Sequence, residues 1–180
     1  MRAPNGRYGV GGSVRPVRKQ RRSARLSMST GPGRFAMDQV EMEQLWSEHL
    51  DGEFAAKDVE ATLETMTDDA VVNHVPVDTG GRGKNELRSF YRDVFIPGWP
   101  PEQQMQMTNR VVGDEQLVDE LRASFRHEVP MEWFLPGVAP TGRPVEVDFV
   151  VVVGFRDGRI ASERIYWDHA AVLRQVGLLS

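Results

Sequence analysis

The chain has 180 residues, no cysteine and a formal net charge of −4, so disulfides and thiol chemistry are excluded. Nine of its 22 basic residues lie in residues 1–36, which contain no acidic residue, so residues 37–180 carry 13 basic and 26 acidic side chains. Its apolar runs are shorter than the roughly 20 residues that span a bilayer, and no secretory signal is evident. We therefore expect a cytoplasmic protein with no membrane partner.

Residues 1–36 lack apolar periodicity and are predicted to be a disordered basic extension, followed by one domain in residues 37–180. The extension fits an organellar transit peptide, a nucleic-acid-binding arm, or a translated stretch upstream of a true start at Met28 or Met37. Met37 immediately precedes the first helical pattern, which favours the third interpretation. The acidic body would repel phosphates, so we expect no nucleic-acid partner.

Three helices are predicted in the first half of the domain. The first begins at Asp38, and its apolar residues recur at helical spacing as far as Phe54. The second follows Asp58, a favourable N-cap residue, and extends to Met66. The stretch "DDAVVNHVP" predicts a short strand, and "DTGGRG" reads as a link to a third helix with an apolar stripe over 87–95.

Four strands and a last helix are predicted in the second half. The strands cover residues 105–112, 116–128, 145–155 and 159–167, and "RDGR" between the last two is a hairpin signal. The stretch "DHAAVLRQVG" predicts a short closing helix. Helices followed by a meander of strands indicate an α+β fold: a cone-shaped, curved antiparallel sheet wrapped on three N-terminal helices, with a short C-terminal helix.

The alternation of side chains along the strands predicts which residues face the core. In 116–128, one face carries Leu121, Ala123, Phe125 and His127. His127 should therefore point inward and Glu128 outward. From Val150 to Val153 both faces are apolar, which one core cannot cover, so we expect a homodimer through the sheet.

The sequence resembles a known family in three places. "PTGRPVEV", "GFRDGRIASERIYWD" and "VLRQVGLL" look like the SnoaL-like polyketide-cyclase branch of the nuclear transport factor 2-like superfamily. The resemblance implies the cone fold, a hydrophobic pocket between sheet and helices, homodimers, and acid–base catalysis by a pocket Asp and His without cofactor or metal. One position departs from the pattern: Val151 stands where those cyclases carry a carboxylate, and Asp148 faces the other way.

Three residues are candidates for proton transfer. His127 shares an apolar inward face, and an imidazole titrates near neutral pH. His74 lies on the strand that lines the pocket in this fold, although Val71 and Asn73 facing inward would instead leave His74 exposed. Asp168 follows an aromatic pair and could orient a histidine, or could be the N-cap of the last helix. Either Asp168 or Glu128 would partner His127.

The substrate-binding candidates surround the expected pocket. Tyr166 could donate to a substrate oxygen, and Trp133 and Phe134 lie in the proline-rich loop near the pocket mouth. Tyr91 and Trp46 occupy core-facing helical positions, and Glu128 is placed at the rim. The spacing of His49, His74, His127 and His169 does not match a zinc motif, so no metal is expected.

The sequence therefore predicts a small cofactor-free enzyme that performs general acid–base chemistry on a small hydrophobic carbonyl compound or lactone. The reaction would be of isomerase, cyclase, dehydratase or hydrolase type. The alternatives are a non-catalytic module that binds a hydrophobic ligand and a protein-interaction module of the same fold.

Overall fold

In the computed structural model of the chain, residues 37–180 are described. The predicted extension, residues 1–36, lies outside the described residues. The first helix, α1 (Gln39–Leu50), begins at a capping box in which Asp38 accepts a hydrogen bond from the amide of Glu41, and Glu41 accepts one from the amide of Asp38. A π-helical segment, η1 (Asp51–Ala56), continues it, and α2 (Val59–Glu64) follows the predicted N-cap Asp58.

Six strands form one sheet in the order β2-β1-β6-β5-β4-β3. Their bounds are β1 (Met66–His74), β2 (Thr79–Arg82), β3 (Gln104–Val112), β4 (Gln116–Arg126), β5 (Pro144–Arg156) and β6 (Arg159–Tyr166). β3 to β6 form the predicted meander, in which each strand pairs antiparallel with the next. β1 pairs with β6 in parallel and so joins the two halves of the chain.

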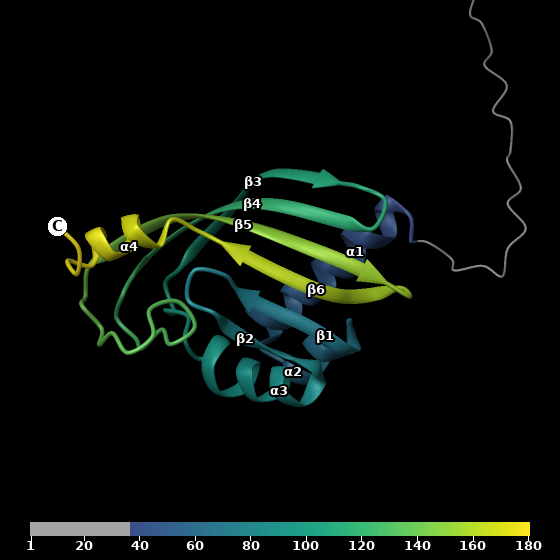
Figure 1. Cartoon of the computed structure of the whole chain (residues 1–180), viewed down its shortest axis with the longest axis horizontal. Helices are drawn as coiled ribbons and strands as arrows, with labels where there is room; N and C mark the ends of the chain where they lie inside the picture. Colours follow the sequence, from purple (N-terminus) through teal and green to yellow (C-terminus); the bar gives the residue numbers. More distant parts are fainter. Residues whose placement is uncertain (1–36) are drawn as a thin grey trace, which may run out of the picture. The chain divides into compact units, whose positions relative to one another are not determined.

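The helices lie against one side of this curved sheet (Figure 1). α1 runs behind β4, β5 and β6, and α2 packs near β1 with α3 (Gly83–Phe90), which continues as the π-helical segment η2 (Tyr91–Phe95). The short α4 (His169–Gln175) packs on β5. The α+β fold class is therefore confirmed. Among residues 37–180, no helix combines the length and apolar character needed to cross a membrane.

Three local predictions were wrong. Met66 begins β1 instead of ending the second helix. The Gly-rich link contains the edge strand β2, which pairs antiparallel with β1 through its backbone. Gly80 there has φ +138°, and a Cβ would collide with the carbonyl of Val72, so the glycine permits a close strand approach that apolar patterning does not reveal. The parallel β1–β6 pair also departs from a purely antiparallel sheet.

The predicted faces of the long strands are confirmed. Along β4 and the residue that follows, Leu121, Ala123, Phe125 and His127 are buried, and Glu128 is exposed. In β5, Val151 and Val153 are buried, whereas Val150 is 38% exposed on the opposite face. The core therefore lies between the sheet and the helices, which also enclose a cavity.

Candidate acid–base site

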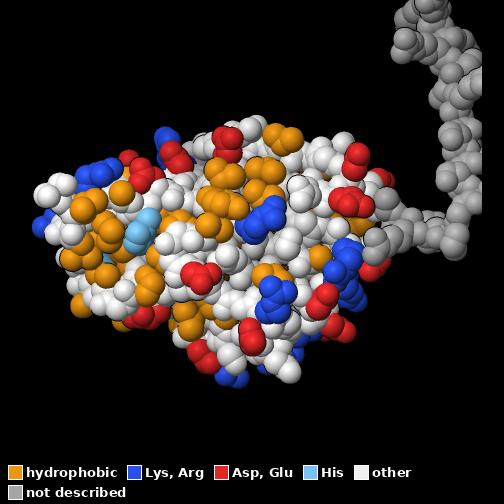
Figure 2. Space-filling model, in the orientation of Figure 1, with side chains coloured by type: hydrophobic (Ala, Val, Ile, Leu, Met, Phe, Trp, Pro, Cys, Tyr) orange, Lys and Arg blue, Asp and Glu red, His pale blue; other side chains and the backbone are white. Residues whose placement is uncertain are grey.

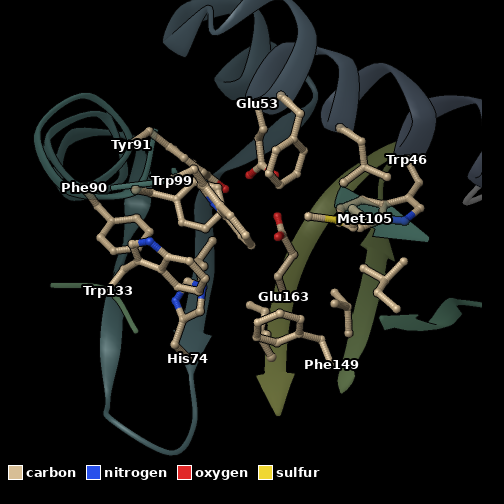
Figure 3. A pocket seen from close by; sticks show the side chains of 17 residues that line it. Trp46, Glu53, His74, Phe90, Tyr91, Trp99, Met105, Trp133, Phe149 and Glu163 are labelled. Atoms are coloured by element: carbon tan, nitrogen blue, oxygen red, sulfur yellow. The ribbon is translucent and has the colours of Figure 1, made fainter. Parts of the chain in front are cut away.

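A cavity of about 50 Å³ lies between the helices and the sheet, room for a few water molecules. Its walls are mostly apolar and strongly aromatic. The aromatic side chains in the lining are Trp46, Phe54, Phe90, Tyr91, Phe95, Trp99, Trp133 and Phe149. Two carboxylates interrupt this wall, Glu53 from η1 and Glu163 from β6, and both turn towards the centre of the cavity (Figure 3).

Both carboxylates meet the buried imidazole of His49. His49 Nε2 lies 3.1 Å from Glu53 Oε1, to which it is hydrogen-bonded, and 3.2 Å from Glu163 Oε1. The second contact has ion-pair distance without hydrogen-bond geometry, so Glu163 Oε1 has no hydrogen-bond partner among the described residues. His49 is fully buried, and both glutamates are about 95% buried.

The hydrogen bonds indicate a doubly protonated ring for His49. Its Nδ1 lies 2.7 Å from the hydroxyl of Thr65, and that hydroxyl already donates to the carbonyl of Thr62 at 2.6 Å. The Thr65 hydroxyl must therefore accept a hydrogen bond from Nδ1–H. Nε2 is then the ring nitrogen that faces the two carboxylates. With Glu53 and Glu163 ionised, Nε2 must carry a proton in order to donate.

The electrostatics agree with this protonation. Burial alone would lower the pKa of His49, but the charges of Glu163 and Glu53 outweigh it and raise the pKa to about 10. Burial raises the pKa of the Glu53 carboxyl, although His49 opposes that shift. Burial also raises the pKa of Tyr91 well above its usual value, so its hydroxyl, 3.5 Å from His49 Nε2, stays protonated.

The local sequence explains how these groups come together. Met42, Trp46, His49 and Glu53 fall on one face where α1 passes into η1, and π-helical turns are frequent at functional sites. Gly52 allows η1 to approach α2, because a Cβ there would lie 2.7 Å from the Thr62 hydroxyl. Glu163 shares the inward face of β6 with Ile165, and both line the cavity.

Four of the nine predicted site residues line this cavity: His74, Tyr91, Trp46 and Trp133. His74 is buried, so the alternative that exposed it is wrong. Burial lowers its pKa to about 4, which keeps the ring neutral. Trp133 from the proline-rich loop packs on Trp99 with ring centroids 4.6 Å apart and donates from Nε1 to the carbonyl of Gly98.

The other five predicted residues lie away from the cavity lining. His127 is buried, but its Nδ1 contacts the hydroxyl of Thr141 at 3.2 Å, and burial lowers its pKa. The expected placement of His127 beside Asp168 or Glu128 in the pocket was wrong, because β4 ends at Arg126 and the ring turns to the Thr141 loop.

Asp168 is the N-cap of α4 and accepts from the amide of Ala171 at 2.8 Å. Tyr166 is 39% exposed on the opposite face of the sheet. Phe134 packs in the core on Trp167, with centroids 5.0 Å apart, and Glu128 is exposed. The structure therefore does not bring these residues to His74.

Sequence reasoning missed His49, Glu53 and Glu163. The available signals were a His and a Glu four residues apart on a helix, and a Glu in phase with Ile165 on a strand. The spacing of the four histidines cannot reveal a site in which one histidine joins two glutamates. One ligand atom from each of these three residues lies within 4.8 Å of the others, so the group could hold a divalent cation in place of the proton on Nε2.

Comparisons with known proteins agree with the fold. The SnoaL-like domain family matches residues 46–163. No curated protein matches the sequence. TsrD from Streptomyces laurentii is 20% identical, with a TM-score of 0.62 over 79% of this chain and 99% of its own. A protein from Jannaschia sp. CCS1, named for its likeness to SnoaL polyketide cyclases, is 21% identical, with a TM-score of 0.63 over 79% of this chain and 95% of its own.

A third similar structure is SalBIII, named as an epoxide hydrolase/cyclase-like enzyme in the formation of a pyran ring in the polyether salinomycin. It is 18% identical, with a TM-score of 0.55 over 73% of this chain and 93% of its own. At such identities these likenesses show the fold alone.

Proposed function

Since this chain belongs to the SnoaL-like domain family, we propose that it is an enzyme that uses its own side chains to move protons on a small, mostly apolar carbonyl compound. The observation that carries the proposal is the buried cluster of His49 with Glu53 and Glu163, the two glutamates lining the cavity. An aromatic cavity gains nothing for its stability from two buried carboxylates, because removing them from water is costly. Perturbed, buried acid–base groups in a cavity are typical of catalytic sites.

Each group has a chemical role in this proposal. Glu163 Oε1, which lacks a hydrogen-bond partner among the described residues, takes a proton from the carbon next to the substrate carbonyl. Glu53, whose pKa is raised by burial, carries a proton at a lower cost than an exposed glutamate and gives it to the substrate oxygen. The products are an enol, a protonated Glu163 and an ionised Glu53.

His49 would return the cluster to its starting state. Its Nε2 lies within 3.2 Å of an oxygen of each glutamate. The imidazolium gives its Nε2 proton to Glu53 and regains one from Glu163, so the proton crosses between the carboxylates without bulk water. Glu53 then gives its proton to another carbon of the enol while Glu163 takes the enol O–H proton, which completes an isomerisation, and the same relay restores both glutamates. Attack of the enol on a second carbonyl of the same molecule, with Glu53 protonating the new alkoxide and Glu163 taking the enol O–H proton, would be a cyclisation.

The cavity limits the substrate class. At about 50 Å³ it admits only a small molecule unless aromatic side chains move. The aromatic walls favour an apolar body, and neutral His74 and the Tyr91 hydroxyl offer hydrogen bonds without adding a charge. The names of the Jannaschia protein and of SalBIII, which refer to cyclisation and epoxide hydrolysis, support proton-transfer chemistry of this kind.

Deuterium exchange tests the proposal without knowledge of the natural substrate. The full chain is incubated in D2O with a panel of cyclic ketones and lactones, and NMR records loss of the α-proton signals. We expect exchange above the buffer rate for at least one compound, and a reduction of about 10²–10⁴-fold in Glu163→Gln. The matched control is Glu115→Gln, an exposed glutamate in the turn between β3 and β4 that should exchange at the wild-type rate.

Two further variants separate the alternatives. His127→Gln should leave the exchange rate unchanged. If His127→Gln instead loses most of the exchange while Glu163→Gln keeps the wild-type rate, His127 is the catalytic group. Ligand binding without exchange anywhere in the panel would favour the non-catalytic binding module and count against an enzyme.

We also propose a homodimer through the outer face of the sheet. Apolar side chains gather over the strands on this face (Figure 2). Side-chain alternation puts Val111, Val150 and Tyr166 on the outer face, where they are 58%, 38% and 39% exposed. Exposed apolar patches of this kind mark interaction sites. A cytoplasmic location remains a prediction.

A further inference from the structure

A partly buried ion pair lies outside the cavity lining and contacts Trp46. Asp119 on β4 is fully buried and pairs in register with Arg110 on β3. The guanidinium donates to both carboxylate oxygens, each at 2.6 Å. Asp119 is not part of the cavity lining.

The second partner of Asp119 connects it to the acid–base cluster. Trp46 Nε1 donates to Asp119 Oδ2 at 2.8 Å, and this bond is buried. An indole has one donor and no acceptor, so this bond fixes the ring's rotation about its side-chain axis. The Trp46 ring lies against the His49 ring with centroids 5.3 Å apart and planes inclined by 15°.

The stacking has an electrostatic consequence for His49. An aromatic face attracts a cation within about 6 Å of its centre, and tryptophan has the strongest such face. The in-plane positions of the imidazolium meet Thr65, Glu53 and Glu163, while Trp46 covers a ring face. A third titratable group near the ring is Tyr91, which meets it edge-on with centroids 6.1 Å apart.

We propose that Arg110 and Asp119 are positioning residues, which hold Trp46 flat against His49 and so keep the imidazolium between the two glutamates. This inference rests on the proposed function for its catalytic meaning. The contacts themselves do not depend on that function. The ion pair between β3 and β4 fixes the Trp46 indole on α1, and the indole covers the His49 ring. With a neutral amide in place of the Asp119 carboxylate, the indole N–H would keep only a weaker acceptor, and Arg110 would no longer hold that acceptor in place, so the ring could tilt.

The test measures the titration of His49 directly, by ¹⁵N NMR of its ring nitrogens in the full chain, with a chelator present to keep divalent cations off the cluster, up to the expected pKa of about 10. Trp46→Leu removes the aromatic face and should lower the midpoint by about 0.4 to 1.5 pH units. Trp46→Phe keeps a ring without the N–H donor, and Asp119→Asn keeps the shape without the charge. Both should lower the midpoint by part of that shift. A role in folding alone would not move this midpoint.

The structure supplies a matched control. Arg122 and Asp148 form the same bidentate pair between β4 and β5, at 2.8 and 3.0 Å, but both side chains are exposed. Asp148→Asn should therefore leave the titration of His49 unchanged. If Trp46→Leu does not fold, the titration midpoints of His49 in Trp46→Phe and Asp119→Asn still test the proposal.

An unshifted midpoint in Asp119→Asn would overturn the proposal, even if Trp46→Leu shifts it, because the ion pair would then have no part in holding the ring. The readout requires no substrate. A shifted midpoint in a protein that exchanges no proton of any ketone or lactone would retain the positioning network and reject the proposed function.

Discussion

The carboxylates of Glu53 and Glu163 share one hydrogen-bond donor, the Nε2–H of His49. Because one N–H cannot align with both, the protonation of this cluster depends on pH. His49 Nε2 can align with only one of Glu53 and Glu163, so the other carboxylate oxygen depends on charge alone. The cluster carries a formal charge of −1 when both glutamates are ionised and His49 is protonated. One further proton makes it neutral, and burial favours that state.

Alkaline pH should destabilise the protein through His49. Its pKa is about 10 in the folded chain and near 6.5 when unfolded. A raised folded pKa stabilises the protein below the unfolded value, and this contribution disappears as the pH rises from 6.5 through 10. Urea midpoints should therefore fall over this range. His49→Gln should be less stable near neutral pH but show a smaller fall, and an equal fall would contradict the assignment.

Acidic pH should destabilise the protein through His74. Burial lowers its pKa from 6.5 to about 4. A depressed pKa means that stability is present above 6.5 and is lost as the pH falls towards 4, because the unfolded chain takes up the proton first. Thermal unfolding should show this loss in wild type. The loss should be smaller in His74→Phe, where a Phe would join the aromatic neighbours Phe90, Phe95 and Trp133. His169→Gln, outside the cavity, serves as the comparison.

At the scale of elements, one close approach fixes the aromatic cover of the cavity. A Cβ at Gly98 would lie 2.8 Å from Trp133 Cδ1 and would also collide with the carbonyl of Val94. Gly98→Ala should therefore destabilise the protein by about 1–3 kcal/mol, as overpacking does, and displace the Trp133 ring. Urea unfolding measures the first effect and tryptophan fluorescence the second.

Gly113→Ala provides the control for this substitution. The nearest atom to a Cβ at Gly113 is 3.5 Å away, an ordinary contact. Its stability should remain close to that of wild type. Equal losses at the two glycines would mean that the cost arises from the backbone and not from contact with Trp133.

The same elements show how far the sequence alone can lead. Side-chain alternation correctly placed His127 inward, and helical spacing correctly assigned α1 and α3, because one strand or helix determines these properties. The partnership of His49 with Glu163 depends on where α1 crosses β6, which no local pattern encodes. The apolar pattern of the sequence does not predict strand β2, because its glycines pair through backbone atoms and bury little side-chain surface.

For the whole molecule, the outer face of the sheet should be covered by a second copy. Val150→Lys places a charge beside the exposed ring of Tyr166, its neighbour on β6, and desolvating that charge in an interface is costly. Sedimentation equilibrium should show a dimer for wild type and a monomer for this variant. Val40→Lys, on a 59% exposed position of α1, should remain a dimer. A wild-type monomer at micromolar concentration would contradict the expectation.

The parallel pairing of β1 with β6 has a consequence for synthesis on the ribosome. His49 and Glu53 emerge near the beginning of the chain, whereas Glu163 emerges near its end, and β6 is the last strand. Until β6 inserts beside β1, Glu163 is missing from the cluster with His49 and Glu53. The sheet that covers the aromatic side chains of the helices is also incomplete until then. Contacts so distant in sequence form slowly, and an exposed apolar face is prone to aggregate meanwhile. A nascent chain of this protein should therefore depend on chaperones until its final strand has been released.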